Sequence, residues 1–164
     1  MPGELEGRVA IVTGGGRGFG QDIARGLAVA GAAVTVTART ESQLAETVSI
    51  VEAVGGRCLA APAEITDQAA VDRVVAETEA KFGPVDILIS NAAITTPVGP
   101  LWEIDPDSWD RTLDVNLIGP MRIAHTVLKG MVRGGGGATL SSSAAAPAPS
   151  PDRMTAPTAS RRRR

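Results

Sequence analysis

Short apolar stretches alternate with longer segments of helical periodicity along most of this chain. Four stretches of strand length are rich in β-branched and aliphatic residues, and each is followed by a polar residue or proline. The segments between them repeat apolar residues every three or four positions, which is typical of amphipathic helices. The predicted strands are 9–12, 33–38, 57–61 and 85–90, with a fifth candidate at 138–140, and the predicted helices begin near residues 21, 40, 67 and 105.

The starts of three predicted helices carry recognisable local signals. Thr40 and Gln43 have the spacing of a capping box, and Asp67 is a suitable N-cap for a helix that runs through residue 82. Asp105 followed by Pro106 is an N-cap and first-turn pair that opens a long helix, 105–132. One side of that helix carries the large apolar residues Trp109, Leu113, Leu117, Met121, Ala124 and Leu128.

Strands that alternate with helices predict an α/β fold with a doubly wound, Rossmann-like parallel sheet. We expect the strand order 3-2-1-4, with the fifth strand beside the fourth, and all carboxyl ends at one edge where ligands bind. Residues 141–164 use mainly Ser, Ala, Pro and Arg. The sequence therefore predicts one cofactor-binding domain over 1–140, truncated after about the fifth strand, and a disordered low-complexity tail over 141–164.

Composition limits the function classes without naming one. Of the 164 residues, 43% are hydrophobic and 21% charged, as in soluble globular domains. Residues 152–164 hold five of the sixteen basic residues and one of the eighteen acidic ones, so the rest of the chain carries a net charge of −6. An acidic body argues against nucleic-acid binding, and no apolar run has membrane-spanning length.

Three further absences shape the expectations for location and chemistry. The N-terminus has no secretory pattern, and the single cysteine, Cys58, lies in a predicted strand, so we expect a cytoplasmic protein with a structural thiol. His125, the one histidine, has no ligand partner near it in sequence, so no metal site is expected. The chain contains no tyrosine.

A glycine-rich turn joins the first predicted strand to the first helix. Its spacing is Thr13-Gly14, three residues, Gly18, one residue, Gly20. A strand, a glycine turn and a helix in this order direct free backbone N–H groups and the helix dipole at an anion, typically a phosphate. The alternative is a tight turn that binds nothing.

This spacing resembles the cofactor fingerprint of the short-chain dehydrogenase/reductase family. The resemblance implies that Gly14, Gly18, Phe19 and Gly20 surround the pyrophosphate of a nicotinamide dinucleotide. The segment after the fourth strand, Asn91-Ala92-Ala93, resembles the family's Asn-Ala-Gly signature, with alanine in place of the glycine.

Four residues bear on the adenosine end of that cofactor. Glu64 follows the third strand, where the family commonly has an acidic residue beside the adenine; the alternative is a surface carboxylate. Ala38 offers no carboxylate to the ribose hydroxyls after the second strand, whereas Arg39 and Arg17 can pair with a 2′-phosphate. NADP is therefore favoured over NAD, unless both arginines are merely solvated.

The family resemblance also implies a catalytic set, and here the chain departs from it. Asn116 in the long helix would hold a water of the proton relay, with Gly119 and Pro120 loosening the helix so that backbone groups pair with its amide. Ser142 or Ser143 would polarise a carbonyl. The family's tyrosine and lysine are absent: Pro157 and Arg161 stand in their register.

Three interpretations follow for the activity. The first is an NADP-dependent oxidoreductase acting on a small alcohol or carbonyl, with an altered or truncated C-terminal part and inactive as written. The second is a non-catalytic module that binds a nucleotide or a protein partner. The third is a non-functional product of a damaged gene. A homo-oligomer would be expected to form through the long helix 105–132.

Overall fold

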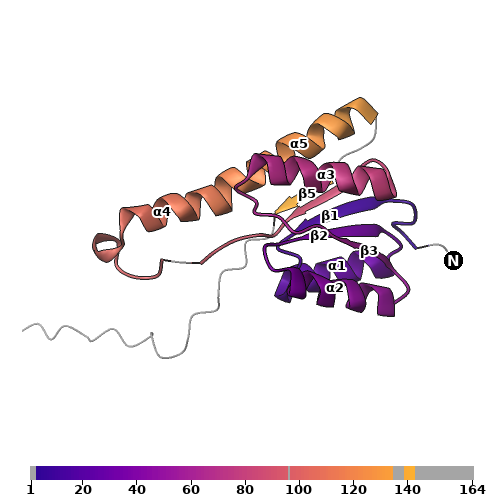
Figure 1. Ribbon diagram of the computed structural model, residues 1–164, viewed down its shortest axis with the longest axis horizontal. Helices are drawn as coiled ribbons and strands as arrows, with labels where there is room; N and C mark the ends of the chain where they lie inside the picture. Colours follow the sequence, from indigo (N-terminus) through magenta and orange to yellow (C-terminus); the bar gives the residue numbers. More distant parts are fainter. Residues whose placement is uncertain (1–2, 96, 135–138, 143–164) are drawn as a thin grey trace, which may run out of the picture.

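Five parallel strands form a single sheet in the computed structural model, which describes residues 3–95, 97–134 and 139–142 (Figure 1). Their order across the sheet is β3-β2-β1-β4-β5, which confirms the predicted order and the place of the fifth strand. Every neighbouring pair is parallel. The strands are β1 (Val9–Thr13), β2 (Ala33–Thr37), β3 (Arg57–Ala60), β4 (Ile87–Ser90) and β5 (Thr139–Ser142).

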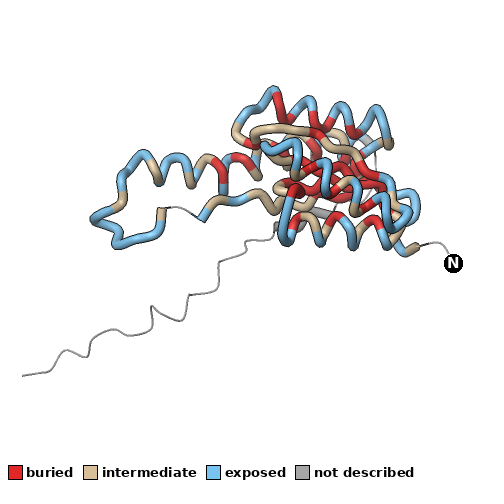
Figure 2. The backbone as a smooth tube through the Cα atoms, turned by 60° about the horizontal axis from the view of Figure 1, so that its bottom comes forward, coloured by how far each residue is buried: buried red, intermediate tan, exposed pale blue. Residues whose placement is uncertain are grey.

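Helices cover both faces of the sheet. Helices α1 (Gly18–Val29) and α2 (Glu41–Ala53) lie on one face, and α3 (Gln68–Phe82) and α5 (Gly119–Gly134) lie on the other (Figure 1). A hydrophobic core lies on each face of the sheet, and successive side chains of β1 point into the two cores alternately. Ala10 and Val12 pack with residues of α1 and α2, and Ile11 packs with residues of α3 and α5. The buried centre is the sheet itself (Figure 2).

The helix-start predictions had different outcomes. The Asp67 carboxylate accepts a hydrogen bond from the Ala69 N–H at 2.9 Å, which confirms the predicted cap of α3. Thr40 occupies the N-cap position of α2, but its side chain makes no capping hydrogen bond, so the capping-box prediction is wrong. The Gln43 side chain instead lies against the glycine turn, where a Cβ added to Gly16 would be 3.0 Å from the Gln43 Cβ.

The predicted single helix over 105–132 is interrupted. Helix α4 (Pro106–Leu113) passes into a π-helical segment, Asp114–Ile118, before α5 begins. Pro120 has no N–H to donate into the helix ladder, which favours the wider turn before it. Gly119 allows close packing on the loop after β3, because a Cβ there would be 2.9 Å from Ile65 Cγ2.

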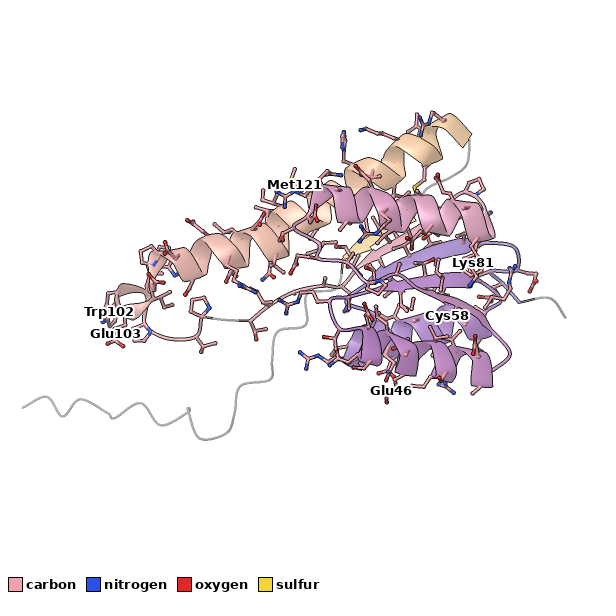
Figure 3. The ribbon with its side chains drawn as sticks, in the orientation of Figure 1. Glu46, Cys58, Lys81, Trp102, Glu103 and Met121 are labelled. Atoms are coloured by element: carbon pink, nitrogen blue, oxygen red, sulfur yellow. The ribbon has the colours of Figure 1, made fainter. Side chains whose placement is uncertain are left out.

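Helix α4 and the segment before it extend away from the sheet as an arm, defined here as residues 97–118 (Figures 1 and 2). Trp102, in a short 3₁₀ turn (Leu101–Glu103), lies near the far end of the arm and is 85% exposed (Figure 3). Several large apolar side chains in this region are exposed. The exposed large residues of the arm and the start of α5 are Val98, Leu101, Trp102, Trp109, Leu113, Leu117, Ile118 and Met121.

Two further sequence-based expectations concern Cys58 and the end of the fifth strand. The predicted burial of Cys58 on β3 is confirmed, and burial raises the pKa of its thiol to about 11. Strand β5 continues to Ser142, past the domain boundary predicted at residue 140, and the tail 143–164 lies outside the described residues. Among the described helices, none combines the length and apolar character needed to cross a bilayer.

Candidate cofactor site

The glycine turn after β1 is shaped by two close backbone approaches. A Cβ on Gly14 would lie 2.9 Å from Ala92 Cα, and Gly14 also has a φ of +64°. A Cβ on Gly20 would lie 2.2 Å from the carbonyl oxygen of Gly14. Real Cβ atoms do not approach backbone atoms this closely, so the turn and the first residues of α1 can pack only with glycine at these positions.

Neighbouring elements hold the turn in place. The Gly15 N–H donates to the Thr37 carbonyl at 3.2 Å, which ties the turn to the end of β2. The buried Thr47 hydroxyl of α2 donates to the Gly15 carbonyl at 2.9 Å and accepts from Gln21 Nε2 at 3.1 Å. Helix α1 begins at Gly18, and the side chain of its N-cap residue, Arg17, makes no capping hydrogen bond to the first N–H groups of the helix.

Asn91 joins this turn to the end of β4. Its Nδ2 donates to the carbonyl oxygens of Thr13 at 3.1 Å and Gly14 at 3.2 Å. The Thr13 hydroxyl in turn accepts from the backbone N–H groups of Asn91 and Ala92, each at 3.0 Å. Residues from two sequence motifs, 78 positions apart, therefore form one hydrogen-bonded unit at the carboxyl edge of the sheet.

A cavity of about 100 Å³ opens at this edge, beside the unit just described. Its wall includes five of the residues proposed from sequence, namely Thr13, Arg39, Glu64, Ala92 and Ala93. Apolar side chains of the α3–α5 core, such as Val71 and Ile123, form its floor. Arg17, Gly18 and Phe19 lie outside this wall, and Phe19 is 66% exposed.

Two of the residues predicted at the adenosine end form an ion pair. Arg39 Nη1 lies 3.7 Å from Glu64 Oε2, with the two side chains 58% and 39% exposed. Arg17 is the N-cap residue of α1, and among the described residues it makes no ion pair.

Sequence reasoning missed Thr37, the last residue of β2. The Thr37 side chain is buried and lines the cavity, and its hydroxyl has no hydrogen-bond partner among the residues that the structure describes. Threonine is common in strands, so the sequence carries no signal for this. A buried hydroxyl without a partner is costly, which makes Thr37 a candidate to hydrogen-bond a ligand.

We expect Thr37→Val to stabilise the free protein by about 1 kcal/mol, because it removes a buried hydroxyl without a partner and keeps the side-chain shape. Thr35→Val is the matched control on the same strand, since the Thr35 hydroxyl accepts from Thr78 Oγ1 at 3.0 Å. Thr35→Val should destabilise by a similar amount. Thermal denaturation of both variants tests this, and destabilisation by both would contradict it.

Asn116 lies in the π-helical segment, and its amide is paired at both ends. Asn116 Oδ1 accepts from the Ile94 N–H, and Asn116 Nδ2 donates to the Ile94 carbonyl, each at 2.8 Å. The expectation that helix backbone groups pair with this amide is wrong, because the loop after β4 supplies both partners. The Asn116 residue is exposed. Since Ile94 lines the cavity, the two hydrogen bonds from Asn116 hold the Ile94 part of the cavity wall in position.

The remaining candidates are the serines near β5. The strand register places Ser142 opposite Ser90, at the same edge of the sheet as the glycine turn. Ser143 lies outside the described residues. Within the described part of the chain, no group of three or more His, Cys, Asp and Glu residues could hold a metal ion.

Comparison with known families agrees with this arrangement. The family model for short chain dehydrogenases matches residues 8–160. The chain belongs to the short chain dehydrogenase family. Its glycine turn, its Asn-Ala-Ala segment and the β3-β2-β1-β4-β5 sheet are therefore features of a dehydrogenase-family fold.

The relatives that this dehydrogenase-family chain matches are longer than the chain itself. It is 38% identical over 141 residues to a short chain dehydrogenase of Pseudocercospora fijiensis, covering 85% of this chain and 45% of that protein. An uncharacterized NAD-dependent oxidoreductase of Mycobacterium tuberculosis is 36% identical over 151 residues, covering 84% of this chain and 54% of the relative.

A solved structure, the short-chain type dehydrogenase/reductase of Mycobacterium marinum, superposes with a TM-score of 0.81 at 29% identity. It covers 84% of this chain and 56% of that one. The chain thus spans about half the length of the relatives it matches.

Proposed function

We propose that this short chain dehydrogenase binds a nicotinamide dinucleotide at the carboxyl edge of its sheet and prefers NADP to NAD. The close backbone approach of Gly14, Gly20 and Asn91 carries the proposal. That packing requires glycine, and it presents the start of α1 to the edge where a pyrophosphate binds in doubly wound sheets.

The residues around the cavity fit such a ligand. The cavity has an apolar floor suited to an adenine ring, and the Thr37 hydroxyl supplies a buried polar group without a partner among the described residues. Backbone groups of the glycine turn and of the segment after β4 would chiefly hold the dinucleotide. The residues that supply them are Thr13, Gly14, Gly18, Phe19, Gly20, Asn91, Ala92 and Ala93. Glu64 would lie near the adenine.

The preference for NADP rests on the end of β2. Ala38 and Arg39 both line the cavity, so the end of β2 offers it a guanidinium and no ribose-binding carboxylate that would favour NAD. Arg17, exposed at the start of α1, is the second cation proposed for a 2′-phosphate. One relative is named for NAD dependence, so both dinucleotides belong in the test.

We expect NADPH to bind more tightly than NADH, and Arg39→Ala to weaken NADPH binding about tenfold with little effect on NADH, because a charge-assisted hydrogen bond to phosphate is lost. Arg133→Ala, an exposed arginine on α5, is the matched control and should change neither affinity. Calorimetric titration of NADPH and NADH into the parent protein and the two variants measures these affinities. Equal affinities for NADPH and NADH, or no effect of Arg39→Ala, would contradict the preference.

For the chemistry we propose an oxidoreductase ancestry without efficient turnover. A bound nicotinamide supplies or accepts a hydride. Asn116 would maintain the cavity wall and a relay water, and Ser142 or Ser143 would polarise the oxygen of a small alcohol or carbonyl. The chain has no tyrosine to transfer the proton. A non-catalytic nucleotide-binding or partner-binding module, or a non-functional product, is the alternative.

We also expect this chain to associate with itself through the arm and the long helix region 105–132. Trp109, Leu113, Leu117 and Met121 recur every four residues and are each at least 36% exposed, so they form one apolar stripe. Sedimentation velocity should show concentration-dependent dimers or larger species. Replacing Leu117 and Met121 by Glu should shift the sample toward monomer, and a monomeric parent protein that binds no hydrophobic dye would refute the expectation.

A further inference from the structure

Glu64 stands between two cavities at the carboxyl edge of the sheet. It lines the cavity that contains Thr37 and Arg39, and it also lines a second one beside α4. The second cavity carries Asp107, Asp110 and Asp114, with Arg111 as the cation on its wall. Glu64 therefore shares one cavity with Arg39, its ion-pair partner, and the other with three aspartates, of which Asp114 is paired with Arg122.

Backbone geometry places Glu64 beside Arg39. The Ala63 N–H donates to the Ala38 carbonyl at 3.1 Å, so the chain segments that leave β2 and β3 stay joined beyond the strands. Arg39 and Glu64 are the next residues of those two segments. The Glu64 carbonyl also accepts from the Asp67 N–H at 3.0 Å, which fixes the turn that leads into α3. The ion pair is thus a consequence of the sheet register as well as of flexible side chains.

We infer that Glu64 is a specificity-determining residue that reduces the preference of this chain for 2′-phosphorylated dinucleotides, by competing with the phosphate for Arg39. The inference rests on the proposed function, in which Arg39 receives that phosphate. Glu64 Oε2 already lies 3.7 Å from Arg39 Nη1, and its negative charge repels a phosphate bound at the same guanidinium. NADP binding must weaken the ion pair, whereas NAD binding leaves it intact.

Removing the carboxylate should change the ratio of the two affinities. We expect Glu64→Gln to raise the affinity for NADPH relative to NADH about three- to tenfold at low salt, a modest change because both side chains are partly exposed. Adenine is common to both dinucleotides, so any contact between Glu64 and the adenine cancels in the ratio. The gain should shrink at high salt, where exposed charges are screened.

The experiment is calorimetric titration of NADPH and NADH into the parent protein, Glu64→Gln and Glu64→Ala, at two salt concentrations. Glu77→Gln is the matched control, because Glu77 forms an ion pair of similar length and exposure with Arg73, 3.9 Å apart and 47% and 57% exposed. Both Glu64 variants should raise the NADPH-to-NADH affinity ratio, and Glu77→Gln should leave it unchanged.

The outcomes separate the two proposals. If the parent protein binds both dinucleotides and neither Glu64 variant raises the ratio, the role of Glu64 is wrong while the proposed function stands. A ratio that falls would mean that Glu64 positions Arg39 for the phosphate, which also overturns the inference. If the parent protein binds neither dinucleotide, the proposed function fails and the role of Glu64 fails with it.

Discussion

Gly20→Ala is expected to destabilise the protein by about 3 kcal/mol and to abolish dinucleotide binding. The added Cβ would lie 2.2 Å from the Gly14 carbonyl oxygen and 2.6 Å from Asn91 Nδ2. Both contacts belong to the hydrogen-bonded unit that joins the glycine turn to β4, so α1 must shift away from the turn. For a domain of this size, the melting temperature should fall by roughly 6–12 °C.

Gly26→Ala on the same helix is the matched control. Gly26 has no atom within 4 Å of the position that a Cβ would take, apart from its own helix and chain neighbours. Alanine there should stabilise the protein by about 0.5–1 kcal/mol and leave dinucleotide affinity unchanged, because it lowers the backbone entropy of the unfolded chain. Thermal denaturation and titration of both variants measure this. Similar stability for the two variants would show that the turn does not depend on close packing at Gly20.

The second large effect concerns catalysis: hydride transfer by the chain of this sequence should be negligible. Reduction of a carbonyl needs a proton at oxygen as the hydride arrives at carbon, and a missing positioned acid typically costs about 10²–10⁴-fold in rate. Among the candidates, Asn116 and the serines do not titrate near neutral pH. Cys58 is buried on β3, and burial raises the pKa of its thiol to about 11.

NADPH oxidation with a broad carbonyl panel tests this expectation. The assay should be run together with a variant that carries Pro157→Tyr and Arg161→Lys, which restores the family's two residue types in their register. Dinucleotide titration of both proteins shows whether a low rate reflects chemistry or binding. Substantial turnover by the parent protein would mean that another group supplies the proton, and the proposed loss of activity would be wrong.

The strands and most helix ends are properties of local sequence, which is why they were predictable. The apolar run of β1 indicated a buried strand. Because successive side chains of a strand point to opposite faces, Ile11 packs in one core and its neighbours Ala10 and Val12 pack in the other. The cap at Asp67 involves only the next two residues. The strand order also followed, because parallel pairing and right-handed crossovers leave few topologies for this succession of elements.

Features that depend on two distant segments were less accessible. The amide of Asn116 was recognised as needing partners, but only packing of the π-helical segment against the loop after β4 selected Ile94. The close packing of Gly119 against Ile65, directly after the π-helical segment, is likewise a contact that the helical pattern does not contain.

The sequence by itself determined the parallel α/β sheet, the glycine turn and five of the residues that line the cavity at its edge. Tertiary structure decided how those residues are paired. It placed Glu64 against Arg39 and left the Thr37 hydroxyl without a partner among the described residues. The reason is physical: backbone conformation follows near neighbours in the chain, whereas the partner of a polar side chain depends on which segments the sheet register brings together at one edge.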